Sequence, residues 1–162
     1  MTRRSQTLLV ALAALFAAAC AGDDADLEQR QADVAEAGAD VMPFDLDATT
    51  HVFEKLPDGG LQTVVADTDD AGQIALIRGH LAEEAERFAR GDFHDPAMIH
   101  GDDMPGLHAL VVGHEGLEIT YAEVERGAEI RFRSQDPALV EALHQWFDAQ
   151  LMDHGAHAEG GH

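Results

Sequence analysis

Apolar and polar residues alternate along four short segments of the chain, and this period of two is typical of strands with one buried face. In the clearest segment, Leu117, Ile119 and Tyr121 alternate with Glu118 and Thr120. Turn-forming residues join the segments in pairs, at positions 57–60 and 126–127, so we expect two hairpins. The four predicted strands span 50–56, 61–66, 117–121 and 128–133.

Each hairpin is followed by a segment with helical spacing of its apolar residues. The first helix is expected to start at an Asp70 N-cap and end before Gly91, and the second to start at Asp136-Pro137 and end at Gly155. Their apolar stripes are Ile74, Ile77, Leu81, Ala85 and Phe88 in the first, and Leu139, Val140, Leu143, Trp146, Phe147 and Leu151 in the second. Two successive β-β-α units predict an α+β fold, in which a four-stranded antiparallel sheet carries two helices on one face.

The segment 90–107 lies between the two units and matches neither period. Gly91, Pro96, Gly101, Pro105 and Gly106 interrupt it, so it is predicted to be a long ordered connection, and such loops often carry function. A short helix is expected over 105–112.

The first twenty residues resemble a bacterial lipoprotein signal peptide. Arg3 and Arg4 precede an apolar run from 8 to 19, and small residues lead to Cys20, the only cysteine. Cys20 is the expected lipidation site, with an ordinary secretory signal as the alternative. We therefore expect an exported protein, anchored by lipid in the cell envelope and facing the periplasm or the cell surface.

Composition divides the rest of the chain into three parts. Residues 21–42 are mostly Ala, Asp, Glu and Gln, and they predict an acidic disordered tether. A single α+β domain is expected over 43–155, followed by a His- and Gly-containing tail at 156–162.

Charge and residue usage narrow the possible ligands. The formal net charge is −21, with 31 acidic residues against 10 basic ones, so nucleic acid is excluded as a partner and cations are favoured. The chain has ten histidines. Because Cys20 is the only thiol, a metal would be held by His, Met, Asp or Glu.

Imidazole and thioether groups recur near the predicted core. His80 and Glu84 share a helix face, and the spacing of His144 and His154 puts both on one side of the last helix. The pattern Met-x-His occurs at 98–100 and again at 152–154, and Met104 follows four residues after His100. The candidate metal ligands are His80, His100, Met104, His144, His154, Met98 and Glu84.

This donor set favours copper, because thioether sulfur suits Cu(I) and imidazole suits both oxidation states of copper. Core packing by the same methionines is the main alternative. A haem with His and Met axial ligands is a further alternative, although no Cys-x-x-Cys-His motif is present. Calcium bound by the aspartates of the 90–107 segment fits less well, because their spacing is not that of an EF-hand.

Four motifs resemble a group of small bacterial proteins that carry the label aspartate carbamoyltransferase. They are Met-Pro-Phe-Asp-Leu-Asp-Ala-Thr-Thr-His-Val-Phe at 42–53, Arg-Gly-Asp-Phe with Asp-Pro at 90–96, Ile-His-Gly-x-x-Met-Pro-Gly at 99–106, and Trp-Phe-Asp-Ala-Gln-Leu-x-Asp-His-Gly at 146–155. The resemblance implies a carbamoyl transfer activity.

The residues themselves favour a binding protein over an enzyme. The chain contains no Ser-Thr-Arg-Thr-Arg phosphate-binding motif, no Gly-x-Ser-x-Gly and no phosphate-binding Gly-Lys loop. We therefore expect copper sequestration or delivery. An interaction or scaffold lipoprotein without metal and an enzyme of the labelled kind remain the alternatives.

Overall fold

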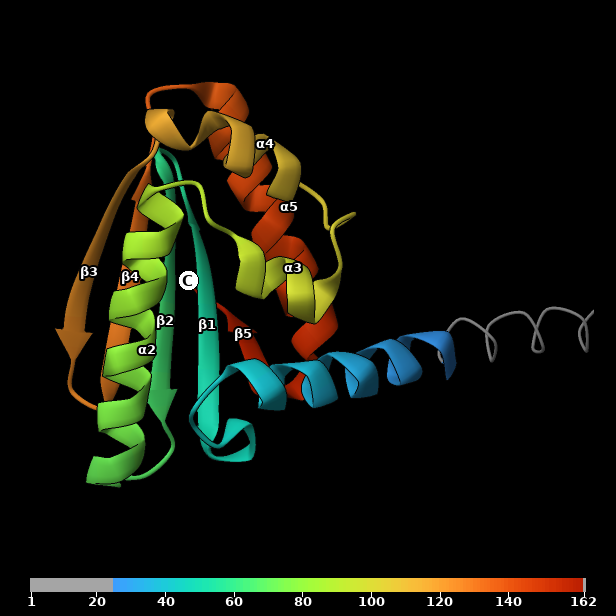
Figure 1. Cartoon of the computed structure of the whole chain (residues 1–162), viewed down its shortest axis with the longest axis vertical. Coiled ribbons are helices and arrows are strands. Elements are labelled where there is room, and N and C mark those ends of the chain that lie inside the picture. Colours follow the sequence, from blue (N-terminus) through green and yellow to red (C-terminus); the bar gives the residue numbers. More distant parts are fainter. Residues whose placement is uncertain (1–24, 162) are drawn as a thin grey trace, which may run out of the picture.

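A five-stranded sheet lies at the centre of the computed structural model, which describes residues 25–161 (Figure 1). Its strand order is β3-β4-β2-β1-β5. The strands are β1 (Thr49–Leu56), β2 (Gly59–Ala66), β3 (Glu118–Val124), β4 (Gly127–Arg133) and β5 (Ala158–Gly160). The two predicted hairpins are β1–β2 and β3–β4, and an antiparallel pairing of β2 with β4 joins them.

Two long helices pack on the sheet, α2 (Ala71–Ala89) and α5 (Pro137–His154) (Figure 1). Both begin as the sequence predicts: the side chain of Asp70 accepts hydrogen bonds from the amides of Gly72 and Gln73, and Asp136 accepts one from Ala138. Capping satisfies amides that have no partner within the helix, so it defines where each helix starts.

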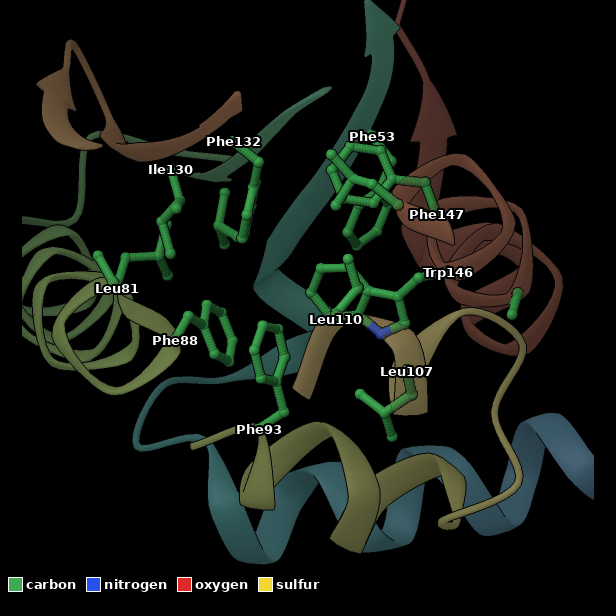
Figure 2. Packing of buried hydrophobic residues seen from close by; sticks show 14 of the residues in the cluster. Phe53, Leu81, Phe88, Phe93, Leu107, Leu110, Ile130, Phe132, Trp146 and Phe147 are labelled. Carbon is green, nitrogen blue, oxygen red and sulfur yellow. The ribbon is translucent and has the colours of Figure 1, made fainter. Parts of the chain in front are cut away.

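One hydrophobic core lies between the helices and the sheet. Figure 2 shows Phe53, Ile130 and Phe132 of the strands facing Leu81 and Phe88 of α2 and Trp146 and Phe147 of α5. Phe53 contacts Phe147 at a ring-centroid distance of 5.2 Å, and Trp146 meets Phe88 edge-on at 5.9 Å. Since residues of both helices join the same cluster, α2 and α5 cover one face of the sheet.

The predicted α+β class is confirmed, but the sheet differs in detail from the expected four antiparallel strands. Its fifth strand, β5, comes from the predicted tail and pairs parallel to β1, with Ala158 opposite His51. Within the described residues, part of the predicted His- and Gly-containing tail thus belongs to the sheet. Its small residues allow a backbone to add to the sheet edge, and sheet edges offer unpaired backbone groups for such addition.

The 90–107 segment also differs from its prediction as an irregular connection. It contains a short helix, α3 (His94–His100), and leads into α4 (Leu107–Gly113). Pro96 was interpreted as a breaker, but it occupies the first turn of α3, where a missing amide proton costs nothing. Gly106 then turns the chain at φ +79°, and a Cβ there would collide with the backbone of Ala142.

Residues 25–41 form a helix instead of the expected disordered tether (Figure 1). Its composition is too polar to build a core, but Val34 is buried and Arg30 forms an ion pair with Asp153 of α5. The predicted signal peptide and Cys20 lie outside the described residues. Among the residues that are described, no helix is long and apolar enough to cross a membrane.

Candidate functional site

Four histidines from four different elements line one cavity of about 40 Å³. They are His51 of β1, His80 of α2, His100 of α3 and His154 of α5. We call this the histidine cavity. A space of this size holds an ion or one or two water molecules, whereas sites for organic ligands usually measure at least about 300 Å³.

Local sequence patterns bring each imidazole to the cavity. His51 lies two residues before Phe53, so alternation along β1 turns both toward the helices. His80 is next to the buried stripe of α2, and His154 is seven residues after Phe147 on α5. His100 is the last residue of α3 and is itself buried.

The ring of His154 is the centre of the group. Its centroid lies 5.0 Å from that of His100, at an interplanar angle of 80°. It lies 5.2 Å from the centroid of His51, with the two planes within 5° of parallel. His80 is further along the cavity, where its ring packs edge-on against Phe44 at 5.6 Å.

A carboxylate fixes the orientation of His100. Nδ1 of His100 lies 2.9 Å from Oδ2 of Asp153, and both side chains are only 1% exposed. Because Asp153 also forms an ion pair with Arg30, it is a carboxylate and accepts this bond. The proton of the neutral ring is therefore on Nδ1, which leaves the lone pair of Nε2 free.

Burial keeps these imidazoles neutral. It lowers the pKa of His51 from 6.5 to about 4 and that of His154 to about 2, and the positive charge that neighbouring histidines would carry adds to the effect. Burial also lowers the pKa of His80 and of His100, although Asp153 partly opposes this at His100. At neutral pH the cavity is thus lined by uncharged rings, the form in which histidine binds metals.

Polar atoms without partners gather around the same space. Among the described residues, four buried side-chain atoms form no hydrogen bond: Nδ1 of His51, Oε1 of Gln62, Nε1 of Trp146 and Oε1 of Gln150. All four residues line the histidine cavity. Buried polar groups in proteins nearly always form hydrogen bonds. The presence of four unpartnered groups around one cavity therefore indicates a binding site for a small polar ligand.

An acidic cluster lies at one end of the cavity. His80, Glu84 and Asp95 line both the cavity and a groove on the surface beside α2. Arg87 donates to Glu84 at 3.1 Å, to Asp92 at 2.9 Å and to Asp95 at 2.5 Å. Burial and the nearby Asp95 raise the pKa of Glu84 to about 8, and the pairing with Arg87 opposes this only in part because three carboxyl groups share the guanidinium.

Three of the predicted ligands are not at the cavity. The side chain of Met98 is 60% exposed, and Met104 is buried in the hydrophobic core. Nε2 of His144 lies 3.0 Å from the carbonyl oxygen of Leu56 and 2.9 Å from that of Gly59, so this ring supports the β1–β2 turn. The cavity does contain His80, Glu84, His100 and His154, and it adds His51, which the sequence analysis did not single out.

The rings approach one another in pairs. Within residues 25–161, no group of three or more His, Cys, Asp or Glu side chains has the geometry to hold a metal ion without rearrangement. A metal bound by three imidazoles would therefore require a change of side-chain conformation.

Comparisons of the chain with protein-family models, with curated proteins and with solved structures give no match. The expected relation to the proteins labelled aspartate carbamoyltransferase therefore stays a prediction.

Proposed function

We propose that this protein binds a transition-metal ion, copper first, through His51, His100 and His154, for sequestration or delivery in the cell envelope. The observation that carries the proposal is the set of three neutral imidazoles, two buried and one half-buried, whose centroids lie 5.0 and 5.2 Å apart in adjacent pairs.

This spacing is close to that of imidazoles that share a metal. With metal–nitrogen bonds of about 2.0 Å and a tetrahedral angle, two ring centroids lie roughly 5 Å apart. The two pairs that include His154 already have this separation, and a common metal would further require the rings to turn about their side-chain bonds so that His51 and His100 approach the same point. The unpartnered Nδ1 of His51 would gain a bond by this change.

The pairing of His100 with Asp153 also supports a metal site. Histidines that ligate metals commonly donate their other ring proton to a carboxylate, which orients the ring and makes the coordinating nitrogen more basic. The 2.9 Å contact has this arrangement, with Nε2 as the free nitrogen.

The choice of metal depends mainly on imidazole. Met98 and Met104 are not at the cavity, where Met42 is the methionine among the lining residues, so the Met-x-His pattern no longer supports Cu(I). Imidazole also suits zinc, nickel and iron, but Cu²⁺ forms the most stable complexes of the divalent first-row series. The net charge of −21 attracts any of these cations.

The chemistry of the cavity favours metal binding over carbamoyl transfer. Carbamoyl phosphate and aspartate are anions whose recognition needs Arg or Lys, and none of the residues lining the cavity is either. A volume of about 40 Å³ is also too small for these molecules.

Competition titration tests the proposal. The metal-free protein is titrated with Cu²⁺ and Zn²⁺ against a chromophoric chelator, and His51→Gln and His154→Gln are compared with His108→Gln, a substitution of an exposed histidine. We expect one tightly bound ion in the wild type and the control, and at least about tenfold weaker binding in the two cavity variants. No tight binding, or equal affinities in all variants, would overturn the proposal.

A further inference from the structure

An ion pair of Arg30 links the helix at residues 25–41 to the histidine cavity. Arg30 donates from Nε to Oδ1 of Asp153 at 2.5 Å and from Nη2 to Oδ2 at 2.7 Å. This two-bond geometry fixes the plane of the carboxylate, which a single bond does not do. The same Nη2 lies 3.4 Å from the carbonyl oxygen of His100.

A continuous chain of contacts thus runs from the helix to an imidazole of the proposed site. Arg30 donates a hydrogen bond to Oδ2 of Asp153, and the same oxygen accepts a hydrogen bond from Nδ1 of His100. Arg30 is 47% exposed while Asp153 is 1% exposed, so the chain connects the surface with the interior. If Arg30 is removed, Asp153 is free to rotate about its side-chain bonds and no longer defines the plane of the His100 ring.

The same helix also covers the cavity. Val41 lines the cavity itself. Val34 and Ala35 line an adjoining groove of about 500 Å³, to which His51 and His154 also contribute. Docking of the helix therefore affects both the orientation of one imidazole and the enclosure of two others.

We propose that Arg30 is a positioning residue for the metal site: through Asp153 it fixes the orientation of His100, so that docking of helix 25–41 sets the metal affinity. This inference rests on the proposed function, because it assigns a role in the same site.

A second ion pair provides a matched control. Lys55 of β1 binds Asp148 of α5 at 2.6 Å and is 41% exposed, close to the exposure of Arg30. It also joins α5 to another element, but within residues 25–161 Asp148 forms no hydrogen bond or ion pair with a histidine of the cavity. A general loss of surface ion pairing would affect both pairs equally.

The test compares Arg30→Gln, Arg30→Lys and Lys55→Gln in the full chain. Copper affinity is measured by chelator competition, and the protonation of the His100 ring nitrogens is followed in the metal-free protein by ¹⁵N NMR. We expect about 10- to 100-fold weaker copper binding in Arg30→Gln, the usual effect of losing such an outer partner. Arg30→Lys should recover part of the affinity, because an ammonium keeps the charge but only one of the two bonds. Lys55→Gln should match the wild type.

The NMR signal separates positioning from stability. We expect the Nδ1 resonance of His100 to shift in Arg30→Gln and to stay in place in Lys55→Gln. If copper affinity falls in Arg30→Gln while this resonance is unchanged, or if the affinity does not fall, the inference is wrong. If Arg30→Gln does not fold, an Arg30→Lys variant with wild-type affinity and spectrum would also contradict it. Failure of the wild type to bind copper would instead overturn the proposed function.

Discussion

Replacement of His51 by phenylalanine should change how stability depends on pH. Burial lowers the pKa of His51 to about 4 from 6.5. Between these values the unfolded chain binds a proton that the native protein does not bind, so stability falls as the pH falls through this window. From pH 7 to pH 5 the loss amounts to about 2 kcal/mol for this residue, at about 1.4 kcal/mol per unit.

Other groups contribute to the same profile, so the comparison must be with a variant. Glu84 has a raised pKa of about 8, and the proton that it keeps in the native state makes the protein more stable as the pH falls from 8 to 4.5. In the wild type, this contribution of Glu84 to the pH dependence of stability has the opposite sign to that of His51. The His51→Phe variant keeps Glu84, and its phenyl ring suits an apolar environment beside Phe53 and Phe44.

The assay is urea unfolding followed by the fluorescence of the single, buried Trp146, at pH 7 and at pH 5. On going from pH 7 to pH 5, the free energy of unfolding of His51→Phe should rise by about 2 kcal/mol relative to that of the wild type. The exposed-site variant His108→Gln should show no such gain. A wild-type-minus-variant difference that is the same at both pH values would refute the assignment of His51 as a buried neutral imidazole.

Three further substitutions test separate parts of the structure. Glu84→Gln should remove the loss of stability between pH 7 and pH 8, where the histidines no longer titrate, visible as a flatter curve of unfolding free energy in that range; a curve as steep there as that of the wild type would contradict the raised pKa. Met104→Ala should cost about 2–5 kcal/mol of stability, as for other buried large-to-small changes, yet leave the number of bound copper ions unchanged by metal analysis. His144→Ala should cost about 1–3 kcal/mol in urea unfolding, because two carbonyl groups lose a partner, and should not alter copper affinity. Copper loss in either of the last two variants would indicate a site elsewhere.

The hairpins and long helices could be predicted because their apolar residues repeat with clear periods. The stripe of Ile77, Leu81 and Phe88 on α2 is legible from sequence alone and is buried in the structure. Helix 25–41 could not be predicted in this way. Its anchors include the buried Val34, a hydrogen bond from Gln31 to the carbonyl oxygen of Met152, and the ion pair between Arg30 and Asp153, which lie 123 residues apart in sequence.

Only part of the candidate site could be predicted from the sequence, for similar reasons. His80 and His154 border apolar stripes in the sequence, and both line the cavity. The Met-x-His pattern was misleading, because residues two apart on a helix do not face the same side; Met98 and Met152 are exposed while His100 is buried. Alternation along β1 put His51 on the inner face, but the neighbours that it meets there depend on how β1 pairs with the rest of the sheet.

X-ray absorption at the copper edge of the loaded protein would identify the atoms that bind the metal. We expect a shell of nitrogen scatterers with the outer-ring signature of two or three imidazoles and no sulfur, and we expect this signature to be lost in His154→Gln. Sulfur in the first shell, or a spectrum unaffected by this substitution, would contradict a site built from His51, His100 and His154.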